Sequence, residues 1–191
     1  ERYMTVYFPC GRIGLKGFFV DNKLPESCGH TVYGVYCENE KTYTIGEMLE
    51  KLPKEEMDVF QLNELFCRFD KLPEEMQRVY DLTLQLKEPR NVKGMIDLME
   101  HLSEVCVVNG IQNERQLGEF LVENELFDVS FPDEVLPYLD YAKIGREHMQ
   151  THQGKLIQGA YVEDTSTDNV NQFSQESNEE NDQSDDYEMK L

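Results

Sequence analysis

Between residues 97 and 140 the chain combines dense negative charge with a regular apolar pattern. This stretch holds eleven acids and a single base, Arg115. Its apolar residues recur at three- and four-residue spacings, which predicts helices with one apolar face each. A chain that carries its charge on such helices must fold around their apolar faces. The stretch is therefore predicted to be folded rather than a solvated acidic tail.

Nine of these acids are candidates for a charged binding surface. They are Asp97, Glu100, Glu104, Glu119, Glu123, Asp128, Asp133, Glu134 and Asp140. In a helix, Asp97, Glu100 and Glu104 would share one face, and Glu119 would lie one turn before Glu123. Like charges at these spacings destabilise a helix, so their repetition favours a functional reason. For any single one of these acids, a solvated helix face is the alternative interpretation.

The whole chain of 191 residues has 38 acids and 18 bases, a formal net charge of −20. This charge argues against direct binding of nucleic acid or of an anionic membrane, and it favours a basic partner. The excess is not confined to the C-terminus, because residues 38–147 alone hold 25 acids and 12 bases. High acidity also keeps proteins soluble, which is the alternative explanation.

The cysteines and the hydropathy pattern bear on the cellular location. Five scattered cysteines without a CxxC pair are typical of reduced intracellular thiols rather than of a disulfide framework. The chain shows no signal-peptide pattern and no apolar run near the ~18 residues that a membrane span needs. The expected location is the cytoplasm.

The predicted fold class is α+β, in several modules. Residues 1–43 are expected to form a small β-rich N-terminal module, and residues 44–106 a helical middle module. Residues 107–162 are expected to form an acidic C-terminal α/β module. The composition of residues 163–191, rich in Asn, Gln, Ser and acids, predicts a disordered acidic tail.

Local signals predict the elements within these modules. Three strands of a small antiparallel sheet are predicted where β-forming residues are frequent, at residues 3–9, 13–20 and 31–37. Capping residues or prolines predict helix starts at Thr44, Pro53, Pro73, Asn91 and Asn113, and a last short helix after Pro132. The helix that follows Asn91 is expected to extend to Leu102, and residues 155–162 predict a closing strand.

Metal-binding and catalytic patterns are weak. Potential zinc ligands in the N-terminal region are Cys10, Cys28, His30 and Cys37. Their spacing fits none of the usual closed zinc-binding patterns. His148 and His152 would share a helix face as a metal pair does, yet without an evident third ligand they are interpreted as surface histidines. No known catalytic motif is present. The prediction is a protein that is not an enzyme and that needs no metal or cofactor.

Residues 138–147, with the sequence YLDYAKIGRE, resemble a segment of the ArdA antirestriction proteins, Tyr-Ile-Asp-Tyr-x-x-Tyr/Phe-Gly-Arg-Asp. Conjugative elements and phages carry this family. Shorter matches in the same order, among them residues 4–7, 44–47 and 62–65, extend the resemblance over about residues 4–163. The residues that carry over from the family segment are Tyr138, Asp140, Tyr141, Gly145 and Arg146.

The resemblance implies an elongated, three-module and usually dimeric protein whose acids mimic DNA phosphates. It implies that the partner is a type I restriction-modification enzyme, whose DNA groove the protein occupies. Duplex DNA carries a charge about every 1.7 Å of its axis. Helix-mounted acids three or four residues apart, at roughly 4.5–6 Å, approach that density. The alternative is an acidic adaptor that binds another basic protein, such as a CRISPR or conjugation protein, without mimicking DNA.

Overall fold

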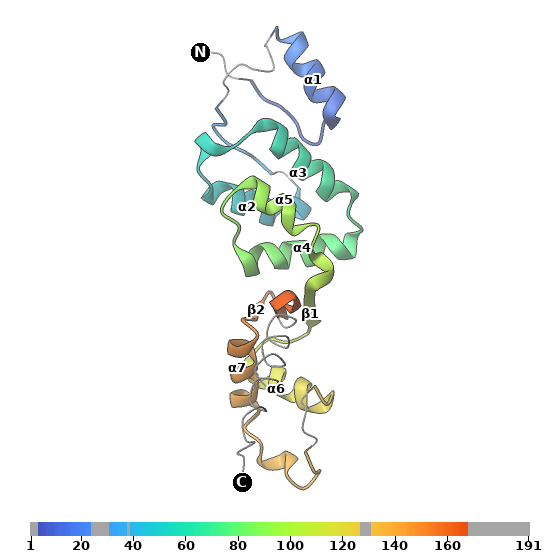
Figure 1. Cartoon of the computed structure of the whole chain (residues 1–191), viewed down its shortest axis with the longest axis vertical. Coiled ribbons are helices and arrows are strands. Elements are labelled where there is room, and N and C mark those ends of the chain that lie inside the picture. Colours follow the sequence, from blue (N-terminus) through green and yellow to red (C-terminus); the bar gives the residue numbers. More distant parts are fainter. Residues whose placement is uncertain (1–3, 24–30, 38, 127–130, 168–191) are drawn as a thin grey trace, which may run out of the picture. The chain divides into compact units, whose positions relative to one another are not determined.

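The computed structural model describes residues 4–23, 31–37, 39–126 and 131–167 (Figure 1). The protein is mostly helical with one small antiparallel sheet, so its fold class is broadly α+β. The chain divides into two compact units, Glu1–Ser103 (unit 1) and Glu104–Leu191 (unit 2). Within the described ranges, no helix has the length and apolar character to span a membrane.

Unit 1 is built mainly from helices. These helices are α1 (Gly11–Asp21), α2 (Tyr43–Lys51), α3 (Val59–Lys71), α4 (Glu74–Lys87) and α5 (Val92–Leu98), with short 3-10 helices at Glu40–Thr42 and Lys54–Glu56. The predicted cap of α5 is confirmed, because the Asn91 side chain accepts a hydrogen bond from the Gly94 N–H at 2.7 Å. The Asp58 carboxylate likewise caps α3. Each cap satisfies N–H groups that a helix start leaves without partners.

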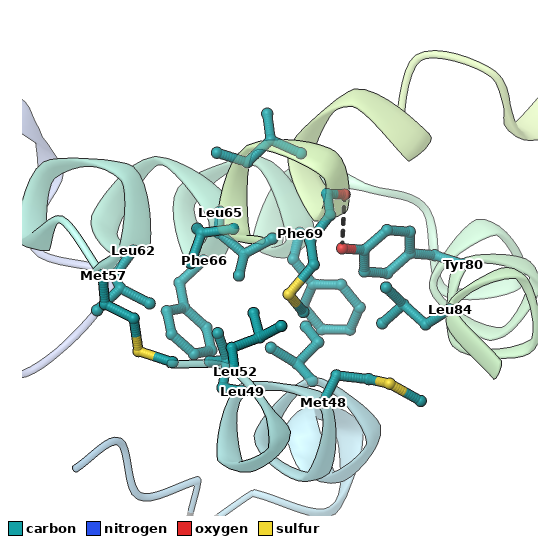
Figure 2. Close-up of a cluster of buried hydrophobic side chains, with 14 of the residues drawn as sticks. Met48, Leu49, Leu52, Met57, Leu62, Leu65, Phe66, Phe69, Tyr80 and Leu84 are labelled. Carbon is teal, nitrogen blue, oxygen red and sulfur yellow. Dashed lines mark hydrogen bonds between the residues drawn. The ribbon is translucent and has the colours of Figure 1, made fainter. Parts of the chain in front are cut away.

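The apolar stripes of α2, α3, α4 and α5 meet in the core of unit 1 (Figure 2). Leu49, Leu65 and Met95 have no exposed surface there. The buried Tyr80 hydroxyl donates a hydrogen bond to the Met95 carbonyl oxygen at 2.8 Å, so the ring packs in the core without leaving its polar atom unpaired. The helical periodicity predicted for this region is thus confirmed by the burial.

The predicted N-terminal sheet is wrong. Residues 13–20 lie within α1, and none of the described residues between 4 and 37 belongs to a strand. Leu15 and Phe19 lie one helical turn apart and are only 1% and 4% exposed. The Phe19 ring also stacks on Phe60 of α3, with ring centroids 5.4 Å apart. Burial at helical spacing therefore outweighs the β-propensity of the aromatic and β-branched residues.

The other two segments predicted as strands pack directly on the helices of unit 1. The Phe8 ring stacks on Phe66 of α3, with centroids 5.9 Å apart, and Val35 contacts the same core. The buried Asn63 side chain accepts a hydrogen bond from the Cys10 N–H at 3.0 Å. Both segments thus bury apolar side chains against the helices without forming strands.

Unit 2 combines two helices with a three-stranded sheet. Its elements are β1 (Val105–Asn109), α6 (Glu114–Glu123), α7 (Tyr141–Thr151), β2 (Lys155–Ile157) and β3 (Ala160–Asp164), with short 3-10 helices at Leu102–Glu104, where the unit begins, Leu136–Tyr138 and Thr165–Thr167. The strand order is β1-β3-β2, and both pairings are antiparallel. Gln158 and Gly159 both have positive φ, as a tight two-residue hairpin turn requires. The single closing strand predicted at 155–162 is therefore a hairpin.

The expected disorder from Glu163 onward is wrong for its first residues. Glu163 and Asp164 complete β3, in register with Cys106 and Val105 of β1. The Thr165 hydroxyl then donates a hydrogen bond to the Glu104 carbonyl oxygen at 2.8 Å. Strand pairing thus orders residues that composition assigns to the tail. Residues 168–191 lie outside the described residues.

Candidate functional site

Helices α6 and α7 approach each other closely at two glycines. A Cβ atom on Gly145 would overlap the carbonyl oxygen of Glu114, and one on Gly118 would overlap that of Tyr141. Only hydrogen atoms fit at these positions, so the two backbones are in direct contact. Gly145, which carries over from the family segment, is thus explained by helix packing.

Three further residues of the family segment also make contacts within unit 2. The Asp140 carboxylate accepts a hydrogen bond from the Lys143 N–H at 3.1 Å and caps α7. The Tyr141 hydroxyl donates to the Leu136 carbonyl oxygen at 3.0 Å. The Arg146 guanidinium pairs with Glu114 of α6 through Nη2 and Oε2 at 2.7 Å.

These contacts have an electrostatic consequence at Glu114. The hydrogen bond from Arg146 favours the ionised carboxylate and lowers the pKa of Glu114. The side chain of Tyr138 is 87% exposed. Tyr138 is therefore available to a partner, as are the exposed residues Asp140 and Arg146 of the segment.

The two acids predicted to share a face of α6 lie on that helix. Glu119 Oε1 pairs with Arg115 Nε at 2.8 Å, so its charge is partly neutralised. Glu123, one turn further on, is exposed. Within the described ranges Glu123 has no ion pair, which makes it the stronger candidate for contact with a basic partner.

The shared helical face predicted for Asp97, Glu100 and Glu104 is wrong. Helix α5 ends at Leu98, and the next N–H groups bind carbonyl oxygens three residues back, as in a 3-10 turn. Glu100 Oε1 lies 2.6 Å from Nη1 of Arg68 on α3. Glu104 is the first residue of unit 2. The chain leaves the helical path here because β1 begins at Val105 and pairs with β3.

Asp133 and Glu134 are exposed in a turn that precedes the 3-10 helix Leu136–Tyr138. The Val135 N–H donates to the Pro132 carbonyl oxygen at 2.9 Å and closes this turn. The short helix predicted after Pro132 is thus a turn followed by a 3-10 helix. Asp128 lies outside the described residues, so its predicted role stays a prediction.

The two units differ in charge balance. The described residues of unit 1 include 15 acids and 12 bases, and those of unit 2 include 11 acids and only four bases. Three of these four described bases pair with acids of the same unit: Arg115 with Glu119, Lys143 with Glu147, and Arg146 with Glu114. The exposed acids Glu123, Asp133 and Glu134 are therefore poorly compensated within unit 2.

A polar cluster that the sequence analysis missed joins α7 to β3. The rings of His148 and His152 stack, with centroids 4.0 Å apart, and His148 Nε2 lies 3.2 Å from Glu163 Oε2. The interpretation of these histidines as loose surface residues is wrong, because the His148 and Glu163 side chains are each only 13% exposed. Alternation along a strand places Tyr161 and Glu163 on one sheet face, but only the folded chain brings α7 to that face.

The environment of Glu163 stabilises its ionised form. Burial alone would raise the pKa of this carboxyl. Hydrogen bonds from His148 and Tyr161, together with the charges of both histidines, outweigh burial and lower the pKa below its ordinary value. Glu163 therefore presents a carboxylate next to two imidazoles.

Searches against models of known protein families and against curated proteins find no match to this chain.

Proposed function

We propose that the protein is a non-enzymatic inhibitor that uses unit 2 to occupy the DNA-binding groove of a type I restriction-modification enzyme. The observation that carries this proposal is the charge of unit 2, whose described residues hold 11 acids against four bases. The resemblance of residues 138–147 to the ArdA segment supplies the class of target. The exposed Tyr138 of that segment is a further candidate contact.

The acids proposed to replace DNA phosphates are three predicted candidates that have no ion pair among the described residues of unit 2. Glu123 lies at the end of α6, and Asp133 and Glu134 lie in the turn before Leu136–Tyr138. Glu119 contributes less because Arg115 pairs with it. Asp140 keeps its charge exposed while its carboxylate caps α7, so we assign it a mixed role. Asp97 is a secondary candidate, because it lies in unit 1, which has a smaller excess of acids than unit 2.

The packing of α6 against α7 supports this use of the acids. A groove that binds DNA is lined with basic residues and gains affinity by releasing counterions, and a fixed array of carboxylates exploits the same field. Acids on flexible chain would lose conformational freedom on binding, which would weaken the complex. The backbone contacts at Gly118 and Gly145 hold the helices that carry or flank the proposed acids.

The experiment that tests the proposal measures inhibition of a purified type I restriction-modification enzyme, with duplex DNA as competitor. The variant E123Q/D133N/E134Q removes three charges from unit 2. Its matched control, E55Q/E56Q/E75Q, removes three exposed charges from unit 1. We expect the first variant to inhibit at least about tenfold less well and the control to change inhibition by less than about twofold.

Three results would count against the proposal. Equal loss in the two variants would mean that total charge, rather than unit 2, is recognised. Inhibition that excess duplex DNA does not relieve would indicate an acidic adaptor bound outside the DNA groove. No inhibition of any type I enzyme would remove the proposed class of target.

A further inference from the structure

Three side chains of unit 2 lie close together and are of the types that bind metal ions. His148 lies on α7, His152 is the C-cap residue of that helix one turn further on, and Glu163 lies on β3. One potential ligand atom from each residue lies within 4.8 Å of the other two. All three residues are partly buried, whereas Glu123, Asp133 and Glu134 are exposed. The cluster is separate from the acids proposed to contact a restriction enzyme.

The distance between two of these atoms matches the spacing of ligands on zinc. His148 Nε2 and Glu163 Oε2 are 3.2 Å apart. Zinc bonds of about 2.0–2.2 Å at a tetrahedral angle place neighbouring ligand atoms about 3.3–3.6 Å apart, close to the observed distance. A metal ion between these atoms would replace the proton that they otherwise share. His152 offers a nitrogen within 4.8 Å of both atoms.

Hydrogen bonds around the cluster orient the ligands. His152 Nδ1 lies 3.0 Å from the His148 carbonyl oxygen, which can only accept a hydrogen bond. The proton of a neutral His152 therefore sits on Nδ1, and Nε2 keeps the lone pair that a metal needs. The Tyr161 hydroxyl donates to Glu163 Oε2 at 2.6 Å. Metal-binding residues in proteins usually have such outer partners, which fix the ring and the carboxylate.

The neighbouring backbone keeps Tyr161 in place. Tyr161 is 1% exposed and its ring lies against His148, with centroids 5.6 Å apart. Gly154 is buried beside it, and a Cβ atom there would overlap the Tyr161 hydroxyl. The Gly154 N–H donates to the Met149 carbonyl oxygen at 3.0 Å, which closes the end of α7 onto the hairpin. The absence of a side chain at Gly154 thus leaves room for Tyr161, the residue that orients Glu163.

We propose that His148, His152 and Glu163 bind a divalent transition-metal ion, with Zn²⁺ as the best fit. Two imidazoles and one carboxylate suit Zn²⁺, whereas Mg²⁺ and Ca²⁺ prefer sites made of oxygen ligands. Three protein ligands leave a fourth position for water. Bound metal would link α7 to β3 and so stabilise unit 2.

The test uses the full chain, freed of metal with a chelator, in a buffer that contains excess Mg²⁺. Magnesium occupies oxygen-only sites on the acidic surface, so calorimetric titration with Zn²⁺ then reports the histidine-containing site. Titration with Co²⁺ adds a spectroscopic readout, because four-coordinate Co²⁺ absorbs visible light more strongly than the hydrated ion. The variants are H152A and E163Q, and the matched controls are H101A, an exposed histidine of unit 1, and E147Q, an exposed acid of α7.

We expect one Zn²⁺ per chain, with affinity at least about tenfold weaker in H152A and E163Q and within about twofold of wild type in both controls. The Tm should rise with Zn²⁺ in the wild type and the controls but not in H152A or E163Q. Far-ultraviolet circular dichroism verifies that the variants are folded, and a folded H152A alone suffices for the comparison. Zn²⁺ affinity that is unchanged in H152A and E163Q would overturn the proposal, as would equal losses in the controls.

Discussion

Units 1 and 2 are stabilised by different kinds of interaction. Unit 1 has nearly balanced charge and a core to which helices α2, α3, α4 and α5 all contribute. Unit 2 has an excess of acids, and the buried cluster described in it is smaller, with Ile111, Leu117, Leu121 and Tyr161 at its centre. Its further contacts are the backbone approach of α6 to α7, the β-sheet and the polar cluster around Glu163.

This difference shows how a fold can carry excess charge. Burial of apolar surface scales with core size, so the larger core gives unit 1 the larger stabilisation from this source. Unit 2 gains directional contacts that fix its backbone and hold its acids in place. We therefore expect unit 1 to be sensitive mainly to cavities and unit 2 mainly to changes at its glycines.

The largest expected effect is a cavity in unit 1. Leu65 has no exposed surface, so Leu65→Ala should lower the free energy of unfolding by about 2–5 kcal/mol through lost burial and an unfilled space. The matched control is Leu126→Ala in unit 2, whose side chain is 53% exposed and should contribute little. Urea denaturation followed by circular dichroism measures both. Equal losses in the two variants would contradict the described core.

The second-largest loss of stability is expected when a methyl group is added at the contact between α6 and α7. Gly145→Ala would force α6 and α7 apart, because the new Cβ overlaps the Glu114 carbonyl oxygen, and should cost about 3 kcal/mol. The matched control is Gly17→Ala in α1, where a Cβ meets no atom within 4 Å. Alanine favours helix at this second position, so a small gain is expected there. Hydrogen exchange of α6 and α7 amides should accelerate in Gly145→Ala alone, and unchanged protection would refute the close contact.

The stability of unit 1 should also depend on pH through Asp81. Burial raises the pKa of Asp81 on α4 from 3.8 to about 6, and its Oδ1 has no hydrogen-bond partner among the described residues. The folded chain therefore holds this proton more tightly than the unfolded chain. Stability from Asp81 is present below about pH 4 and is lost as the pH rises through about 6. The loss is about 1–2 kcal/mol after allowance for partial exposure.

The variant that tests this effect is Asp81→Asn, with Asp70→Asn, an exposed acid of the same unit, as control. Thermal unfolding of each should be followed from pH 4.5 to pH 7.5. Relative to the control, Asp81→Asn should gain stability as the pH rises, since it lacks the carboxylate that becomes charged in a buried place. Parallel curves for the two variants would mean that Asp81 titrates normally.

The smallest effect is expected at the exposed ion pair of unit 2. Arg146→Ala removes the contact with Glu114, and we expect a lower Tm but a smaller change than in Gly145→Ala, because solvent screens exposed pairs. Arg78→Ala, an exposed arginine of α4, serves as control. Differential scanning calorimetry can compare the three variants. A loss as large as that of Gly145→Ala would show that the ion pair contributes as much to the helix contact as the glycine does.

The sequence predicts those parts of the fold whose signals are local. The caps at Asn91 and Asn113 and the apolar stripe of α3 are visible in the chain, and the corresponding helices form. The glycines and aromatic residues of residues 13–20 resemble a strand pattern, whereas in the structure Leu15 and Phe19 are buried at helical spacing. That choice depends on α3, which local patterns do not include.

The site was predictable to a smaller degree. The acids of unit 2 are visible as an excess of charge, but which of them pair with Arg115 or Arg146 depends on distances in the folded chain. Glu163 lies 15 residues from His148 in a segment whose composition suggests disorder. Strand pairing with β1 places it beside the histidine, and no local motif encodes that pairing.

The most direct test of the proposed role of unit 2 is the salt dependence of its affinity for a type I restriction-modification enzyme. Binding by fixed carboxylates should weaken steeply as salt rises, and E123Q/D133N/E134Q should flatten that dependence while E55Q/E56Q/E75Q leaves it unchanged. An affinity that stays constant from low to high salt, or a dependence that is the same in both variants, would contradict the assignment of DNA mimicry to unit 2.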